Sequence, residues 1–161
     1  ATDQTGKFPI KSIHGMQYIL VLYDYDSNVI LAEPMKSRLQ TDMVKAYDEC
    51  YQQLKNAGIK PVLQRLDNEV SDLLIEAITE KELSYQLAGA KDHRLNPAER
   101  AIQTWKNHFV ANLHGCDQDF PAFLWCKLVP QVTMTLNMLR KSRINPKLSA
   151  YNQVFGNFDY N

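Results

Sequence analysis

Hydrophobic residues follow two different spacings along the chain, and these spacings predict its strands and helices. Short runs rich in Ile, Val, Leu and Tyr, bounded by turn residues, are typical of buried strands. Such runs predict strands over 17–25, 29–35, 61–66 and 83–88, with a further short strand within 1–10. The Asp-Ser-Asn sequence at 26–28 is turn chemistry, so 17–35 is expected to form a hairpin.

Elsewhere the apolar residues recur every three to four positions, which indicates amphipathic helices. The clearest case is 41–58, where they fall on one stripe and Gly58 supplies a helix-ending signal. Further helices are predicted over 71–82, from Asn96 to about Leu113, from about Phe120 to Arg140, and over 147–155. A hairpin followed by alternating strands and helices predicts an α/β fold with a mixed sheet and helices on both faces.

Composition and charge are those of a single globular domain without a strongly basic or acidic balance. With 161 residues, of which 45% are hydrophobic, the chain is expected to form one domain, 1–161. Lys and Arg (18) balance Asp and Glu (18), so any DNA contact must depend on local patches. Three cysteines without a CxxC spacing favour reduced thiols and an intracellular protein. No apolar run is long enough to span a membrane, and the start without Met suggests a fragment of a longer polyprotein.

Three acidic residues are candidates for a common site. Asp3 lies in the first predicted strand, Asp67 follows the strand 61–66, and Glu99 lies in the first turn of the helix that starts near Asn96. The carboxyl ends of neighbouring strands collect ligands in open α/β sheets. Three carboxylates at such an edge repel one another unless divalent cations neutralise them, and oxygen ligands favour Mg²⁺ or Mn²⁺.

Several stretches together resemble the catalytic core of a retroviral-type integrase from an LTR retrotransposon, within the ribonuclease H-like superfamily. They are "TDQTGKF" at 2–8, "GMQYILVLYDYDSNVILAEPMKSR" at 15–38, "LDNE" at 66–69, "HRLNPAERAIQTWKNHF" at 93–109 and "LWCKLVPQVTMTLNMLRKSRINPKLSAYNQVFG" at 124–156. The resemblance covers nearly the whole chain, and the order and spacing of the motifs are more specific than any one of them. The sequence departs from the family at Glu69 and Pro97, where glycine is frequent, and in a shorter interval between Asp67 and Glu99.

The resemblance implies a ribonuclease H-like fold with a five-stranded mixed sheet, and a polynucleotidyl transferase. Asp3, Asp67 and Glu99 would hold two Mg²⁺ or Mn²⁺ ions and catalyse 3′-end processing and strand transfer, integrating element DNA into target DNA. Expected partners are DNA and further copies of the chain, as a homodimer or higher oligomer, with no membrane. The implied location is the nucleus and a virus-like particle or pre-integration complex.

The residues around Glu99 admit two interpretations. Glu99 itself could complete a capping box with Asn96, and the family resemblance favours the metal-ligand interpretation over this one. Gln103 and Lys106 share a helix face with Glu99, which is either solvated or runs along bound DNA. His93 and Asn96 are further candidates for DNA contact.

Other interpretations remain open. A basic cluster at Arg140, Lys141, Arg143 and Lys147 is either a solvated helix end or a surface for the phosphate backbone. The protein could also be a different ribonuclease H-like nuclease, or a non-catalytic module for DNA binding or dimerisation derived from an integrase.

Overall fold

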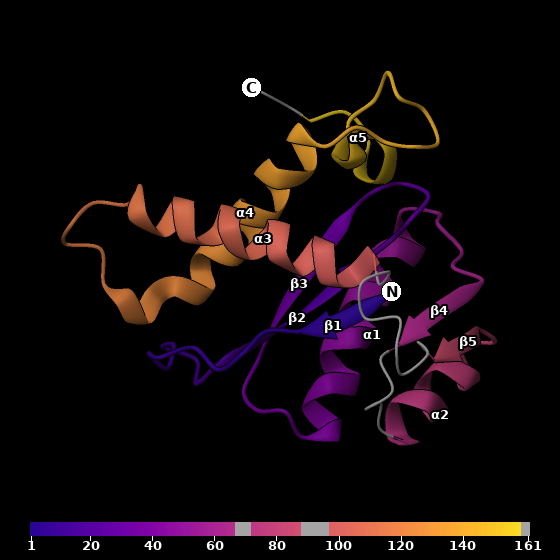
Figure 1. Cartoon of the computed structure of the whole chain (residues 1–161), viewed down its shortest axis with the longest axis horizontal. Coiled ribbons are helices and arrows are strands. Elements are labelled where there is room, and N and C mark those ends of the chain that lie inside the picture. Colours follow the sequence, from indigo (N-terminus) through magenta and orange to yellow (C-terminus); the bar gives the residue numbers. More distant parts are fainter. Residues whose placement is uncertain (67–71, 88–96, 159–161) are drawn as a thin grey trace.

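All five predicted strands and all five predicted helices are present in a computed structural model, which describes residues 1–66, 72–87 and 97–158 (Figure 1). The strands are β1 (Thr2–Gln4), β2 (Tyr18–Tyr23), β3 (Ile30–Met35), β4 (Leu63–Leu66) and β5 (Ser84–Leu87). The helices are α1 (Gln40–Asn56), α2 (Asp72–Glu80), α3 (Pro97–His114), α4 (Trp125–Leu139) and α5 (Ala150–Phe155). The helix predicted from about residue 120 begins as a 3₁₀ turn, Ala122–Leu124, before α4.

The strands pair as an antiparallel three-stranded sheet, β1-β2-β3, and a parallel two-stranded sheet, β4-β5, so antiparallel and parallel pairs occur together as predicted. β2 pairs antiparallel with β1 on one side and β3 on the other, so that Asp3 lies opposite Val21 and Val21 lies opposite Ala32. β4 and β5 pair in parallel. β4 also contacts β1, and the Gln64 side-chain amide donates a hydrogen bond of 3.1 Å to the Thr2 hydroxyl oxygen. The strand that precedes Asp67 therefore lies beside the strand that holds Asp3.

Two hydrophobic clusters cover the opposite faces of the three antiparallel strands. Because side chains alternate along a strand, Leu20 and Leu22 face one cluster, and Ile19 and Val21 face the other. The first cluster contains buried residues of α1, α2 and α5, and the second contains those of α3 and α4. Figure 1 shows α3 crossing these strands on one side, with α1 on the other. This is the layered arrangement that the hydrophobic pattern predicts.

The predicted apolar stripe of α1 is its buried face. Ala46, Tyr47, Cys50 and Leu54 are buried there. The helix ends where the sequence indicated, because Gly58 has a φ of 77°, a left-handed conformation that glycine adopts without steric cost. The Ile59 N–H then donates to the carbonyl oxygen of Leu54, which closes the helix end and directs the chain toward β4.

The turn between β2 and β3 is joined to the segment after α4. Asn28 has a φ of 62°, and its side-chain oxygen accepts hydrogen bonds from the Tyr23 hydroxyl and from Arg140. The Asn28 amide donates to the carbonyl oxygen of Lys141 at 2.8 Å. Arg143 lies 4.1 Å from the centre of the Tyr25 ring and donates to the Tyr25 carbonyl oxygen. Arg140 and Arg143, two members of the predicted basic cluster, therefore hold the fold together at this turn.

Candidate active site

Asp3 faces the side of the sheet that α3 covers. Residues directly opposite each other in an antiparallel pair share a face, so Asp3 lies on the same face as Val21. Val21 packs in the cluster that contains Ala101, Ile102 and Trp105 of α3. Asp3 is half-buried, and its carboxylate accepts a hydrogen bond of 2.6 Å from the Gln4 N–H.

Glu99 lies in the first turn of α3, and its side chain is exposed. α3 begins at Pro97, the residue type preferred at a first helical position. Ala101 and Ile102 are buried against the strands, and α3 contacts β1 as well as β2. The packing of these two residues therefore holds α3, the helix that contains Glu99, against the strands, while the Glu99 side chain stays exposed to solvent.

Asp67, the third predicted carboxylate, lies outside the described residues. β4 ends at Leu66, which is buried, so Asp67 is the next residue after a strand that contacts β1. His93 and Asn96 lie outside the described residues as well. The predicted convergence of the three acids and the predicted capping role of Asn96 therefore stay predictions.

The predicted DNA-contacting face of α3 is polar and accessible. Gln103 is exposed and donates a hydrogen bond of 2.9 Å to Asn107, and Lys106 is half-buried. Neither Glu99 nor Lys106 forms an ion pair within the part of the chain that the structure describes. The stripe on the other side of the helix, which contains Trp105 and Phe109, is buried as predicted.

Two residues that contact or belong to the first segment, Arg38 and Gln4, were not singled out by the sequence pattern. The Arg38 guanidinium donates a hydrogen bond of 3.0 Å to the Thr5 carbonyl oxygen and lies over the Tyr18 ring. The side-chain oxygen of Gln4 is buried and has no hydrogen-bond partner among the described residues. No local pattern records the contacts of Arg38, three residues after the end of β3, or the burial of the Gln4 side-chain oxygen, because both depend on packing between distant segments.

The donor chemistry of Asp3 and Glu99 fits a divalent metal ion. Carboxylate oxygens are the ligands that Mg²⁺ and Mn²⁺ prefer, and these two residues belong to elements in contact with each other. Across residues 1–66, 72–87 and 97–158 no group of three or more His, Cys, Asp or Glu side chains could hold a metal ion. Asp67, the third predicted ligand, is not part of those ranges.

Solved structures with the same arrangement of strands and helices identify the fold. The chain matches a chain in a cryoEM structure of the simian T-cell lymphotropic virus intasome in complex with PP2A regulatory subunit B56 gamma (TM-score 0.72, 14% identity), covering 96% of this chain and 52% of that one. It matches the BIV integrase catalytic core domain (TM-score 0.67, 12% identity, 95% and 90% coverage). It also matches the HTLV-2 integrase catalytic core domain in complex with magnesium, in a trimeric form (TM-score 0.68, 18% identity, 95% and 93% coverage).

The chain has the fold of a retroviral integrase catalytic core. It spans about half the length of the simian viral chain, and nearly all of the two isolated cores. No protein-family model and no curated protein sequence matches it. At 12–18% identity the likeness shows the fold alone. No helix in the described ranges has both the length and the apolar character needed to cross a membrane.

Proposed function

We propose that this chain is the catalytic core of an integrase of an LTR retrotransposon, and that it processes DNA 3′ ends and joins them to target DNA. The observation that carries the proposal is the contact between α3, whose first turn contains Glu99, and β1, which contains Asp3. Asp67 follows the strand on the other side of β1. These are the positions from which three carboxylates would reach one phosphodiester.

The three carboxylates divide the work by position. Asp3 is half-buried in β1, which pairs with β2 and contacts β4, so it would hold the ions from the strand side. Glu99 is exposed, and it would close the site from the helix side. Two Mg²⁺ or Mn²⁺ ions held there would supply Lewis-acid stabilisation of the charge that develops on the phosphate oxygens. Water is the nucleophile in end processing, and a DNA 3′-hydroxyl is the nucleophile in joining.

DNA would continue along the exposed face of α3. Lys106 lies seven residues after Glu99, about 10 Å along the helix, which is suitable for a phosphate further along the strand. His93 and Asn96, which precede the helix, would contact DNA near the acids, and Gln103 lies between the acids and Lys106. The proposed assembly is a homodimer or higher oligomer in a pre-integration complex, in the nucleus and in virus-like particles.

The test is the joining reaction and its reverse on DNA. A branched DNA that mimics the joined product already presents its 3′-hydroxyl, so the reverse reaction does not require recognition of an element end whose sequence is unknown. We expect cleavage and resealing of this branched DNA with Mg²⁺ or Mn²⁺, and none with chelator. Asp67→Asn, which removes a charged ligand but keeps the side-chain shape, should lower the rate by at least about 100-fold.

The matched control is Asp26→Asn, the same change at an exposed acid in the β2–β3 turn. It should retain full activity. Direct metal binding provides a second measurement, because Mg²⁺ that binds only the folded chain raises its melting temperature, and Asp67→Asn should remove that rise. Full activity of Asp67→Asn, or activity in chelator, would contradict the proposal. Cleavage of RNA–DNA hybrids but not of branched DNA would indicate a different ribonuclease H-like nuclease.

A further inference from the structure

The connection between β1 and β2, residues 6–16, presents apolar and cationic side chains to solvent in a fixed position. Trp125 donates a hydrogen bond of 2.8 Å from its indole N–H to the Ile10 carbonyl oxygen, and the Ile13 N–H donates to the Phe123 carbonyl oxygen at 2.8 Å. The Phe8 ring stacks on Trp125 with 4.3 Å between ring centres. This β1–β2 connection is therefore held against the start of α4 and is not a loose loop.

The exposed side chains of this connection are of two kinds. Ile10, Ile13 and the neighbouring Phe123 are 46%, 55% and 47% exposed. Exposed cations, Lys7 and Lys11, alternate with them along the chain, and no Asp or Glu occurs between residues 4 and 23. Exposed apolar side chains that are rimmed by charge of one sign are typical of an interaction site.

A groove between α1 and α2 has the opposite character. It has a volume of about 490 Å³ and contains the apolar residues Val44 and Leu73, of which Leu73 is 41% exposed. Its acidic lining residues are Asp48, Glu49, Glu76 and Glu80, and Lys45 is the cation beside them. The α1–α2 groove therefore combines apolar contact area with a largely negative rim.

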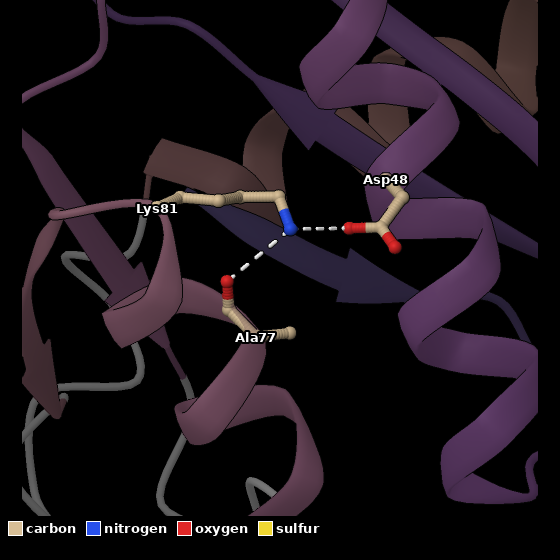
Figure 2. A network of polar contacts seen from close by, with 3 residues as sticks. All are labelled: Asp48, Ala77 and Lys81. Atoms are coloured by element: carbon tan, nitrogen blue, oxygen red, sulfur yellow. Dashed lines mark hydrogen bonds and ion pairs between the residues drawn. The ribbon is translucent and has the colours of Figure 1, made fainter.

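Most of this negative charge is uncompensated. Figure 2 shows Lys81, at the end of α2, reaching Asp48 on α1 at 2.6 Å and the Ala77 carbonyl oxygen at 3.2 Å. This is the only ion pair within the described residues. Lys81 thus joins the two helices and neutralises Asp48, while the exposed Glu49, Glu76 and Glu80 have no cationic partner there.

We propose that the β1–β2 connection of one chain docks in the α1–α2 groove of a second copy. The connection extends to the left of Figure 1, whereas α2 lies at the right, so one chain cannot fill its own groove. The formal charges of the whole chain cancel, but the β1–β2 connection is positive and the α1–α2 groove is largely negative. The connection of one copy is therefore complementary in charge to the groove of another. Such a contact is head-to-tail, so it forms a ring or extends from copy to copy.

Few apolar residues take part, so the contact belongs to the small and transient class of interface. It should appear at micromolar concentrations and weaken as salt screens the charges. The proposal does not depend on DNA or on metal ions. Its outcome can therefore be separated from that of the proposed catalytic function.

Two charge-reversed variants test the contact by sedimentation velocity over a range of concentrations and salt. One carries Lys7→Glu with Lys11→Glu, and the other carries Glu76→Lys with Glu80→Lys. All four residues are exposed, so both variants should keep the melting temperature of the parent chain. Each variant alone should lose the salt-sensitive association step, with at least about a tenfold weaker affinity, because like charges now meet.

Mixing the two variants in equal amounts tests whether the two surfaces bind each other. The unchanged groove of the first variant receives the unchanged connection of the second, and the reversed pair is complementary as well, so association should return. The control pair Lys55→Glu with Lys60→Glu makes the same charge change at exposed positions outside both surfaces and should associate like the parent chain. Ile13→Ser should weaken association without altering its salt dependence.

Three outcomes would overturn the proposal. The first is a parent chain with no salt-sensitive association at any concentration tested. The second is association that neither variant changes, which would indicate a contact through another face such as the β3 edge. The third is loss in both variants without recovery in the mixture, because the two surfaces would then not meet each other.

Discussion

The β2–β3 turn and the start of α3 differ in whether their polar side chains have partners within the chain. At the turn, Asn28 hydrogen-bonds to Tyr23, Arg140 and the Lys141 carbonyl oxygen, and Arg143 covers Tyr25. At the start of α3, by contrast, Glu99 is exposed and without an ion pair in the described part of the chain. Among the residues that the structure describes, the side chains of the turn are therefore paired with one another, and the Glu99 carboxylate has no ion pair.

The difference separates structural charge from charge that is available for a ligand. A polar group that already has its partners contributes to stability, and using it for a ligand would require breaking those contacts. A group that is exposed and unpaired contributes little to stability and costs little to engage. Changes at the turn should therefore lower stability and leave activity intact, and changes at the start of α3 should do the reverse.

The largest expected effect is that of Glu99→Gln on activity. Removing one negative ligand while keeping its shape should lower the rate on branched DNA by at least about 100-fold. Because the side chain is exposed, the free energy of unfolding should change by less than about 1 kcal/mol. Denaturant titration and the rate assay on the same preparation check both parts. A variant that loses stability and keeps its rate would show that Glu99 is a capping residue only.

Next in size is the effect of Asn28→Gly on stability. Glycine accepts the positive φ of this position, so the change removes the side-chain hydrogen bonds without adding backbone strain. We expect a loss of about 2–3 kcal/mol in the free energy of unfolding, with the rate of the folded protein unchanged. Asn28→Ala is the companion variant, and its additional loss measures the strain of φ 62°. Equal free energies of unfolding for Asn28→Gly and the parent would show that the hydrogen bonds of Asn28 do not stabilise the fold.

A smaller effect is expected from Lys106→Glu on DNA affinity. The change replaces attraction to a phosphate with repulsion, so affinity at low salt should fall by about tenfold, and the dependence on salt should become shallower. Metal binding should not change, because the residue is about 10 Å along the helix from Glu99. Lys55→Glu, at the exposed end of α1, is the matched control. Equal affinities and equal salt slopes for both variants would place the DNA path elsewhere.

The sequence predicted the elements of this fold well because their signals are local. The α1 stripe, the Gly58 helix end and the Pro97 helix start depend on residues within a few positions of one another. The position of Glu99 in the first turn of its helix was predicted in the same way. Its approach to Asp3 stays a prediction from the sheet-edge argument and the family resemblance, because the contact between α3 and β1 depends on long-range packing that no local pattern records.

The contacts that the sequence did not predict join distant positions. Asn137 on α4 accepts a hydrogen bond from the Ile30 N–H and donates one to the Ile30 carbonyl oxygen, across 107 positions. This pair satisfies the backbone N–H and carbonyl of Ile30, and no local sequence pattern near either residue predicts it. The contacts of Arg140 and Arg143 with the β2–β3 turn were not predicted either. A run of cations at a helix end looks the same in the sequence whether its side chains are solvated or stacked on tyrosines.

The smallest expected effect concerns Glu33, a carboxylate that is only partly satisfied. Burial raises its pKa above the ordinary value of 4.5, opposed by a hydrogen bond of 2.6 Å from Gln53, and the nearby Glu49 raises it further. The folded chain therefore keeps its proton at a pH where the unfolded chain has lost it. Stability should fall as the pH rises from about the ordinary value through the raised one, and this loss should persist at pH 7. Glu33→Gln keeps an oxygen that can accept from Gln53 and has no charge to bury, so it should be more stable than the parent at pH 7 and equal to it below about pH 4. Urea titrations at both pH values measure this difference. A variant that is less stable than the parent at pH 7 would show that the ionised carboxylate is compensated, and Glu33 would then belong with Asn28 among the satisfied groups.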